Sequence, residues 1–229
     1  MKHRIVSLLL MVLLLVAGYG VAEAGMNEVH EVEEAIAIIK DFSKIPENQI
    51  PPSLLSHAQA IAVIPGVLKI GFIFAGNYGK GVISVRDKSG SWTNPAFVTL
   101  TGGSIGWQIG AQSADIILVF KSIKSIDDMT SGKFTLGADA SVAIGPVGRQ
   151  VTAGTDFELK SEVYSYARTR GLFAGVSIQG AALEIDYDGI AGFYDNTQIG
   201  ARDIFETPDL NAPKEAADFR QALAEQSRR

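Results

Sequence analysis

Cysteine is absent from all 229 residues of the chain. This absence excludes disulfide bonds, thiol catalysis, cysteine metal sites and the lipid-modified cysteine of a bacterial lipoprotein. Histidine is nearly as scarce: after His3 the chain holds His30 and His57, and the scattered carboxylates give no ligand spacing with them. We therefore expect neither a metal site nor a cofactor.

Positive charge is also in short supply. The chain carries 20 Lys and Arg residues against 25 Asp and Glu residues, a formal net charge of −5. This balance argues against nucleic acid as a partner and against simple electrostatic adhesion to an anionic membrane. Any binding of anions must therefore come from a local cluster of basic residues.

A long apolar run occurs at the start of the chain. Residues 2–4 are basic, "IVSLLLMVLLLVAG" follows, and "AEA" offers a peptidase site that ends at Ala24. The pattern predicts a secretory signal peptide over residues 1–24. An uncleaved membrane anchor is the alternative, for which the run is short. We expect residues 25–229 to form one domain of an exported protein, periplasmic or secreted, either free or peripheral on the membrane.

Helical periodicity marks both ends of the remaining chain. Residues 28–42 predict an amphipathic helix with Asn27 as its N-cap, and Pro52 opens a short second helix. Residues 211–227 predict a C-terminal helix with Asn211 as its cap. The expected apolar faces of the two long helices consist of Val29, Val32, Ile36, Ile39 and Phe42, and of Ala216, Phe219, Ala222 and Leu223.

Between these helices the chain changes to short apolar runs separated by glycines. Turns are expected at "PG" (65–66), "GN" (76–77) and "KSGS" (88–91). "ADIILVF" predicts a buried strand, "SIKSIDDMTSG" a short helix and turn, "FTLGADASVAIG" (134–145) one alternating strand, and "ALEIDYDG" the last strand. The expected fold class is α+β: a large, mostly antiparallel, curled or barrel-like, Gly-rich sheet with an N-terminal amphipathic helix and a C-terminal helix.

One motif has the spacing of an enzyme. "GGSIG" (102–106) fits G-x-S-x-G with Ser104 as the nucleophile, but such an elbow needs a helix after it and a histidine later in the chain. Every histidine precedes Ser104, and the residues after it continue an extended, glycine-rich pattern. "GNYGKG" (76–81) has neither dinucleotide nor Walker spacing and predicts a hairpin turn. We therefore expect no catalytic residues and no enzyme.

The stretch "YSYARTRGLFAGVSIQG" (164–180) is the candidate binding segment. Read as a strand, it places Tyr164, Tyr166, Arg168 and Arg170 on one face. Two phenols and two guanidinium groups suit a phosphate-bearing headgroup at a membrane interface. The alternative is the wet face of an ordinary antiparallel strand, with each arginine paired to a neighbouring carboxylate.

Four blocks of the sequence together resemble the SYLF-domain family. The blocks are "GSWTNPAFV", "GWQIGAQSADIILVF", "FTLGADASVAIGPVGR" and "VYSYARTRGLFAGVSIQG", and the resemblance covers roughly residues 30–205. It implies a lipid-binding, non-enzymatic domain whose eukaryotic members bind phosphoinositides and whose yeast members also bind actin. Many exported bacterial proteins carry this domain alone. The resemblance adds weight to a lipid-binding site made of Arg149, Tyr164, Tyr166, Arg168, Arg170 and Phe173.

From these residues and the resemblance we expect a non-catalytic domain that binds phospholipid headgroups, of phosphoinositide type or another, at the bacterial cell envelope. The alternative is an envelope structural or protein-interaction module without lipid specificity. The first helix is acidic where the family pattern is basic, and the chain is expected to be exported, so we do not expect actin as a partner. Arginines that converge beside exposed apolar residues favour lipid, whereas arginines paired with acids favour a protein partner.

Overall fold

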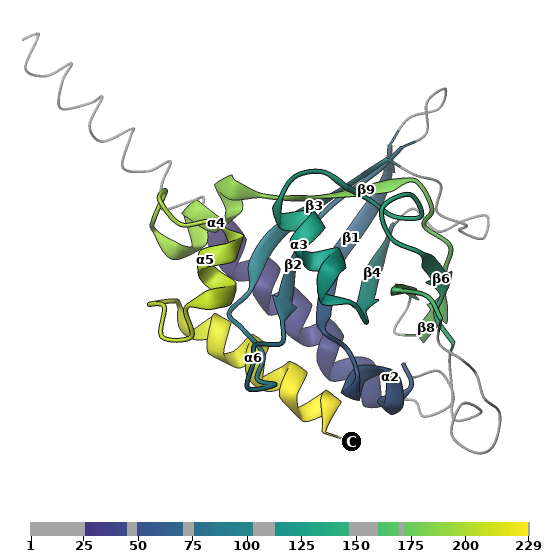
Figure 1. The fold of residues 1–229 in the computed structure, drawn as a ribbon, viewed down its shortest axis with the longest axis horizontal. Coiled ribbons are helices and arrows are strands. Elements are labelled where there is room, and N and C mark those ends of the chain that lie inside the picture. Colours follow the sequence, from purple (N-terminus) through teal and green to yellow (C-terminus); the bar gives the residue numbers. More distant parts are fainter. Residues whose placement is uncertain are drawn as a thin grey trace, which may run out of the picture.

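The computed structural model describes residues 26–44, 50–70, 76–102, 113–146, 160–169 and 172–228. The expected signal peptide, Ser104, Arg149 and Arg170 lie outside these residues. The fold is drawn in Figure 1.

Within the described residues, nine strands form one sheet. Its order is β5-β9-β3-β2-β1-β4-β7-β6, with β8 also paired to β7, and every pair is antiparallel except β6 with β7. The expected α+β fold with a curled, mostly antiparallel sheet is therefore confirmed. The strands are β1 (Ala60–Ile70), β2 (Gly76–Val85), β3 (Ala96–Gly102), β4 (Ser113–Phe120), β5 (Phe134–Thr135), β6 (Val142–Ile144), β7 (Val163–Thr169), β8 (Leu172–Gly175) and β9 (Ala181–Ile185).

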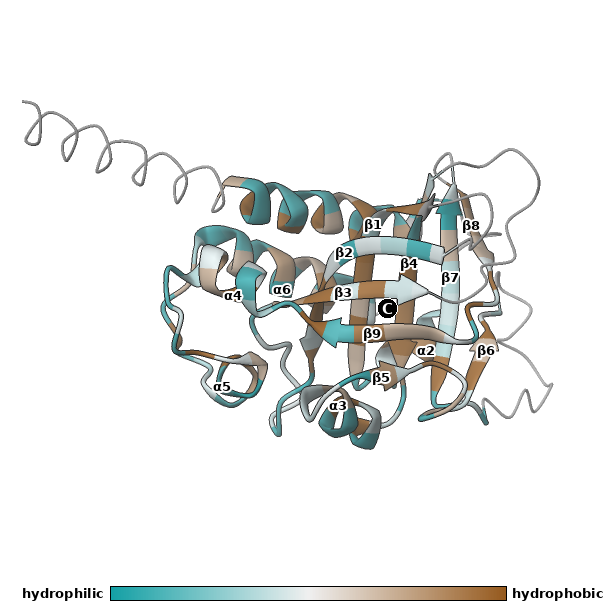
Figure 2. Ribbon diagram, turned by 90° about the horizontal axis from the view of Figure 1, so that it is seen from above, coloured by the Kyte–Doolittle hydropathy of each residue, from teal (hydrophilic) through white to brown (hydrophobic). Residues whose placement is uncertain are grey.

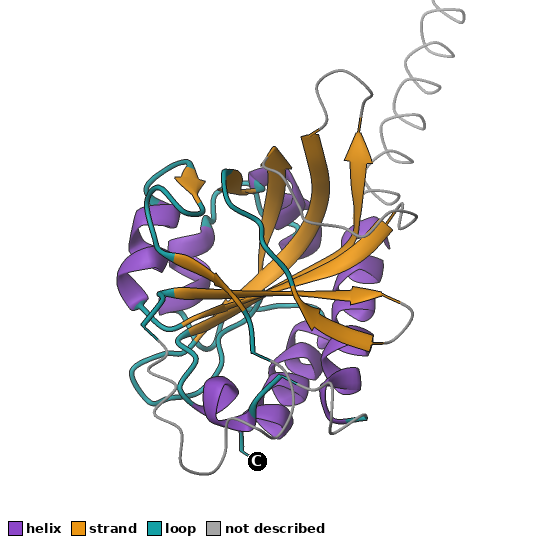
Figure 3. Cartoon of the chain, turned by 90° about the vertical axis from the view of Figure 1, so that its right-hand side faces the viewer, coloured by secondary structure: helices purple, strands orange, loops and turns teal. Residues whose placement is uncertain are grey.

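Helices cover the sheet on both sides (Figure 3). An N-terminal helix over residues 26–40 continues into the 3₁₀ turn η1 (Asp41–Ser43), and it lies on the side of the sheet opposite to α3 (Figure 2). The remaining helices are α2 (Pro52–Ser56), α3 (Ile123–Thr130), α4 (Tyr187–Tyr194), α5 (Ala201–Glu206) and α6 (Lys214–Ser227).

The expected helices are present, but both predicted caps are wrong. Asn27 lies inside the N-terminal helix, and Pro213 rather than Asn211 precedes α6. Proline fixes its own φ near the helical value, which suits the residue that leads into a helix. Two helices, α4 and α5, were not predicted. Asp186 caps α4 by accepting a hydrogen bond from the Gly189 backbone N–H at 3.0 Å.

The core lies between the sheet and its helices. The predicted stripes are buried at Val32, Ile36, Ile39 and Phe42 of the first helix and at the four predicted residues of α6. Strands β1 and β4 pair at the centre of the sheet and are apolar on both faces, as Figure 2 shows. A strand buried on both faces is expected to form a continuous apolar run, which is why "ADIILVF" was recognisable.

Two predicted turns are instead parts of strands. Strand β1 runs through "PG" with a bulge, in which Gly66 has a φ of 54°. The "GN" and "GNYGKG" segments lie in β2, and residues 79–81 are opposite that bulge. A Cβ at Gly79 would lie 2.7 Å from the Val67 Cγ2 atom, and one at Gly81 would lie 2.2 Å from the Val63 carbonyl oxygen. These glycines therefore allow close strand packing, not chain reversal.

The prediction of a single strand over residues 134–145 is also wrong. It is divided into β5 and β6 by a turn at residues 137–139. Gly137 has a φ of 89°, and the Asp139 carboxylate accepts a hydrogen bond from the Thr135 backbone N–H at 2.7 Å. A left-handed glycine and an Asp side chain bonded back to the main chain stabilise a turn that the apolar alternation concealed.

Candidate functional site

The two tyrosines of the predicted binding face point into the protein. Tyr166 is fully buried, its hydroxyl donates to the Pro146 carbonyl oxygen at 3.0 Å, and its ring lies directly over Gly145. Burial raises the pKa of the Tyr166 phenol above its usual range. The Tyr164 hydroxyl, also in the interior, accepts a hydrogen bond from the Ser161 backbone N–H at 3.1 Å. Both phenols therefore contribute to packing in this structure.

Arg168 is engaged by two carboxylates. Its Nε donates to Asp115 Oδ2 at 2.7 Å, and its Nη1 pairs with Asp41 Oδ2. Asp115 in turn accepts a hydrogen bond from the Gly66 backbone N–H at 3.0 Å through its other oxygen. The arginine thus joins the end of the N-terminal helix to β4 and to the bulge of β1. Arg168 therefore serves to join these elements, and its two carboxylate partners would compete with any anionic ligand.

The other predicted site residues are divided between the core and the parts of the chain that are not described. Phe173 is buried and meets Phe42 edge-on, with ring centroids 5.2 Å apart. Arg149 and Arg170 lie outside the described residues. Headgroup binding by this set of six residues therefore stays a prediction.

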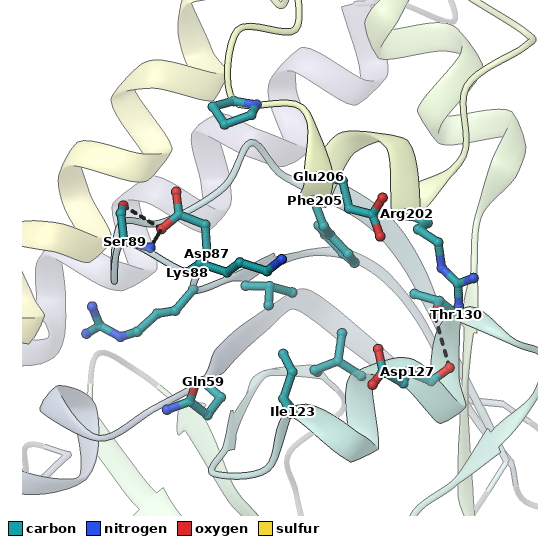
Figure 4. A pocket seen from close by; sticks show the side chains of 14 residues that line it. Gln59, Asp87, Lys88, Ser89, Ile123, Asp127, Thr130, Arg202, Phe205 and Glu206 are labelled. Carbon is teal, nitrogen blue, oxygen red and sulfur yellow. Dashed lines mark hydrogen bonds between the residues drawn. The ribbon is translucent and has the colours of Figure 1, made fainter.

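An open groove of about 890 Å³ lies between α3, α5 and the loop that follows β2 (Figure 4). We name it the α3–α5 groove. Its apolar surface comes from Val85, Ile123, Ile126, Phe205 and Pro208. Ile123, the first residue of α3, is 49% exposed. An exposed isoleucine beside a half-buried phenylalanine in a concave surface is typical of a binding site for apolar side chains.

The wall of the α3–α5 groove formed by the β2–β3 loop is held by hydrogen bonds. The Asp87 carboxylate accepts hydrogen bonds from the Ser89 hydroxyl and from the backbone N–H groups of Ser89 at 2.8 Å and Ser91 at 3.0 Å, and these bonds lower the pKa of Asp87. Arg86 donates to the carbonyl oxygens of Ala58 at 2.8 Å and Gly90 at 2.7 Å. A wall braced in this way is organised before any ligand arrives.

Charges of both signs surround the apolar surface. Lys88 enters from the β2–β3 loop and Arg202 from α5, on opposite sides of the groove, with Asp127 and Glu206 nearby (Figure 4). The lining residues include no histidine or cysteine, and the Thr130 hydroxyl donates to the Asp127 carbonyl oxygen at 3.0 Å. Among the described residues there is no cluster of side chains suited to a metal ion. The groove therefore offers contact surface and charge, which are the elements of recognition.

Sequence reasoning missed this groove. No sequence signal sets Ile123 apart, because its i, i+3 spacing to Ile126 places it on the same side of the predicted helix as the buried Ile126 and Met129. The rest of the groove comes from α5, a helix that was not predicted, and from the β2–β3 loop, for which only a turn was predicted. In the described part of the chain, no helix combines the length and the apolar character needed to cross a membrane.

The structure defines a class of protein: an α+β domain with a curled, almost entirely antiparallel sheet, helices at both ends and an open groove beside the sheet. Residues 101–226 match the model of the Ysc84 family, described as "Las17-binding protein actin regulator". The chain belongs to this family, the SYLF-domain family that it resembles in sequence.

Several relatives support this assignment. SH3 domain-containing YSC84-like protein 1 of Xenopus laevis is 30% identical over 199 residues, which cover 84% of this chain and 59% of the relative. Protein YSC84 of Saccharomyces cerevisiae is 34% identical over 161 residues, covering 67% of this chain and 34% of the relative. SH3 domain-containing protein PJ696.02 of Schizosaccharomyces pombe is 39% identical over 140 residues, or 60% and 32% of the two chains. The chain thus spans only part of the length of these relatives.

Proposed function

We propose that this domain is a non-catalytic interaction module that binds a segment of a protein partner in the α3–α5 groove. One observation carries the proposal: an open apolar surface, with Ile123 half exposed, faces a wall fixed by the hydrogen bonds of Asp87 and Arg86. Pre-organised apolar clefts with a polar rim bind peptide segments with little loss of conformational entropy on the receptor side.

Two further facts support a protein partner. Arg168, the described arginine of the predicted headgroup site, already pairs with Asp41 and Asp115, so a phosphate there would have to displace two carboxylates. The family is described as Las17-binding, and a yeast relative is named LAS seventeen-binding protein 3. The partner of the present chain is proposed by class only, as a protein of the compartment in which the chain acts, which we propose to be the cell envelope.

The direct test is selection of a random peptide library against the purified protein, followed by measurement of Kd for the recovered peptides. Ile123→Asp should weaken binding by about tenfold or more, because a buried apolar contact is replaced by a charge. The variant should fold normally, because an acidic residue in the first turn of a helix is favourable. Tyr187→Asp is the matched control, since Tyr187 is 60% exposed and opens α4 outside the groove. Recovery of no peptide, or equal loss in both variants, would contradict the proposal.

Phospholipid binding is the second candidate, and a separate surface favours it. Leu68 and Tyr78 are register partners on β1 and β2 and are 50% and 41% exposed. An exposed leucine beside a tyrosine suits the boundary between lipid headgroups and acyl chains. The test is co-sedimentation with neutral, phosphatidylglycerol, cardiolipin and phosphoinositide vesicles at low and physiological salt. Vesicle binding that is lost in the double variant Leu68→Ser/Tyr78→Ser but retained in Ile123→Asp would support this candidate. Absence of binding to every vesicle would exclude it.

A further inference from the structure

A second cavity, of about 510 Å³, lies on the other side of the β2–β3 loop from the α3–α5 groove. It is formed by that loop and the C-terminal half of α6. We name it the arginine pocket, because Arg86, Arg220 and Arg228 line it, and Glu225 is the one acidic residue among its described lining residues. Arg86 also lines the α3–α5 groove, so the two cavities adjoin at this residue.

No carboxylate among the described residues neutralises these three arginines. Arg86 bonds to carbonyl oxygens, the Arg220 Nε is buried without a hydrogen-bond partner in the described part of the chain, and Arg228 forms no ion pair with another described residue. Glu225 accepts a hydrogen bond from the Gln221 side-chain amide at 2.9 Å. Several other described cations do pair with acids, namely Lys44, Lys80, Lys133, Arg168 and Lys214.

The inner wall of the pocket is rigid. Trp92 is buried, and its indole N–H donates to the Ser227 hydroxyl at 3.0 Å. The Arg86 guanidinium carbon lies 4.4 Å from the centroid of the Trp92 ring. Burial lowers the pKa of Arg86, which reflects the cost of holding this cation away from water without an anion. An unpaired donor and unpaired cations in a fixed cavity together favour an anionic occupant.

We propose that the arginine pocket receives a carboxylate side chain of the same peptide segment whose apolar anchor occupies the α3–α5 groove. The inference rests on the proposed function, since it assigns the chemistry of that ligand. The partner segment then carries an aspartate or glutamate on one side of the β2–β3 loop and an apolar residue on the other. Arg86, which faces both cavities, lies between the two contacts.

The test uses a peptide recovered by the library selection and its analogue with each acidic residue changed to the amide. On the parent protein, the amide analogue should bind about tenfold more weakly, and raised salt should reduce the difference. Arg228→Gln and, separately, Arg220→Gln should weaken the acidic peptide and leave the amide analogue unchanged. Arg228 is exposed at the end of α6, so its variant should fold as the parent does. Lys40→Gln, an exposed lysine outside both cavities, is the control for loss of one positive charge.

The outcomes separate this inference from the proposed function. Suppose that Ile123→Asp abolishes binding of the peptide, but the acidic peptide and its amide analogue bind the parent equally well. This result would overturn the proposal for the arginine pocket and would support the proposed α3–α5 groove. In a Trp107→Phe background, where Trp92 is the remaining tryptophan, a change of fluorescence on adding inorganic phosphate, together with equal affinity for the acidic and amide peptides, would assign the pocket to a phosphorylated ligand and overturn the proposal. Failure to recover any groove-binding peptide would overturn both proposals.

Discussion

Arg168 shows how a residue that looks like a ligand donor can serve the fold. Its position in "YSYARTR" suggested a headgroup contact, yet its guanidinium group binds Asp41 and Asp115 from two other elements. The side chain is 20% exposed, so water screens the pairs only in part. Neither carboxylate could be assigned as its partner from sequence, since both lie far away along the chain.

Arg168→Gln should therefore destabilise the protein by about 2–3 kcal/mol, because it leaves two partly buried carboxylates without a cation. Urea unfolding at neutral pH measures the change. Lys44→Gln is the control: Lys44 pairs with the same Asp41 but its side chain is 69% exposed, so a change below about 0.5 kcal/mol is expected. If Arg168→Gln lowers the free energy of unfolding no more than Lys44→Gln does, Arg168 does not hold the end of the N-terminal helix against the sheet.

Glu31 is a second residue whose state depends on the fold. It lies on the N-terminal helix near Lys80, Asp186, Glu28 and Glu34, and its buried Oε1 has no hydrogen-bond partner among the described residues. Burial is the main cause that raises its pKa from 4.5 to about 7, while Lys80 opposes the shift. Lys80 itself binds Asp186 Oδ2 at 2.6 Å, which limits its help to Glu31.

This pKa predicts a pH-dependent cost. Between pH 4.5 and about 7 the folded protein holds a proton that the unfolded chain has released, so the contribution of Glu31 to stability falls as pH rises through that interval. Glu31→Gln should be more stable than the parent by on the order of 2 kcal/mol at pH 8, and the difference should vanish toward pH 4.5. Denaturant unfolding across pH measures it, with the exposed Glu33→Gln as control. A difference that does not change with pH would contradict this role of Glu31.

At the scale of elements, β1 and β2 are matched to each other through backbone contact. The bulge of β1 brings its main chain against Gly79 and Gly81, where β2 has no side chain. The glycine pattern in the sequence predicts turns here, because a glycine that reverses the chain cannot be distinguished, without its partner strand, from a glycine that lets a neighbouring strand pack closely.

Gly81→Ala should accordingly destabilise the protein by about 3 kcal/mol or more, since the new Cβ would lie 2.6 Å from the Ile64 Cα and backbone atoms cannot move aside easily. Gly132→Ala, where no atom lies within 4 Å of the added Cβ, should change stability by less than about 1 kcal/mol. Thermal unfolding of the two variants compares them, and equal melting temperatures would disprove the close strand packing.

The sequence predicted the elements with strong local patterns and missed those determined by distant contacts. The two terminal helices, β4, α3 and β9 follow from apolar periodicity or a continuous apolar run. The division of residues 134–145, the bulge of β1 and the groove against α5 depend on which segments meet, and no single window of sequence contains that information. For the same reason the family blocks identified the domain but did not identify its open surface.

At the scale of the whole molecule, compartment and function are linked proposals. If residues 1–24 are a signal peptide, the protein isolated from its natural host should begin at Gly25. Intact-mass measurement of that protein decides the matter. A mass that includes residues 1–24 would contradict cleavage and would favour the membrane anchor as the alternative.

We propose that the braced apolar groove and the adjoining arginine pocket form one binding surface for a protein segment. The decisive experiment measures the affinity of one library-selected peptide for the parent, Ile123→Asp and Tyr187→Asp. Ile123→Asp should bind at least about tenfold more weakly, while Tyr187→Asp should bind as the parent does. Equal affinity for all three proteins would contradict it and would place the binding surface elsewhere on the domain.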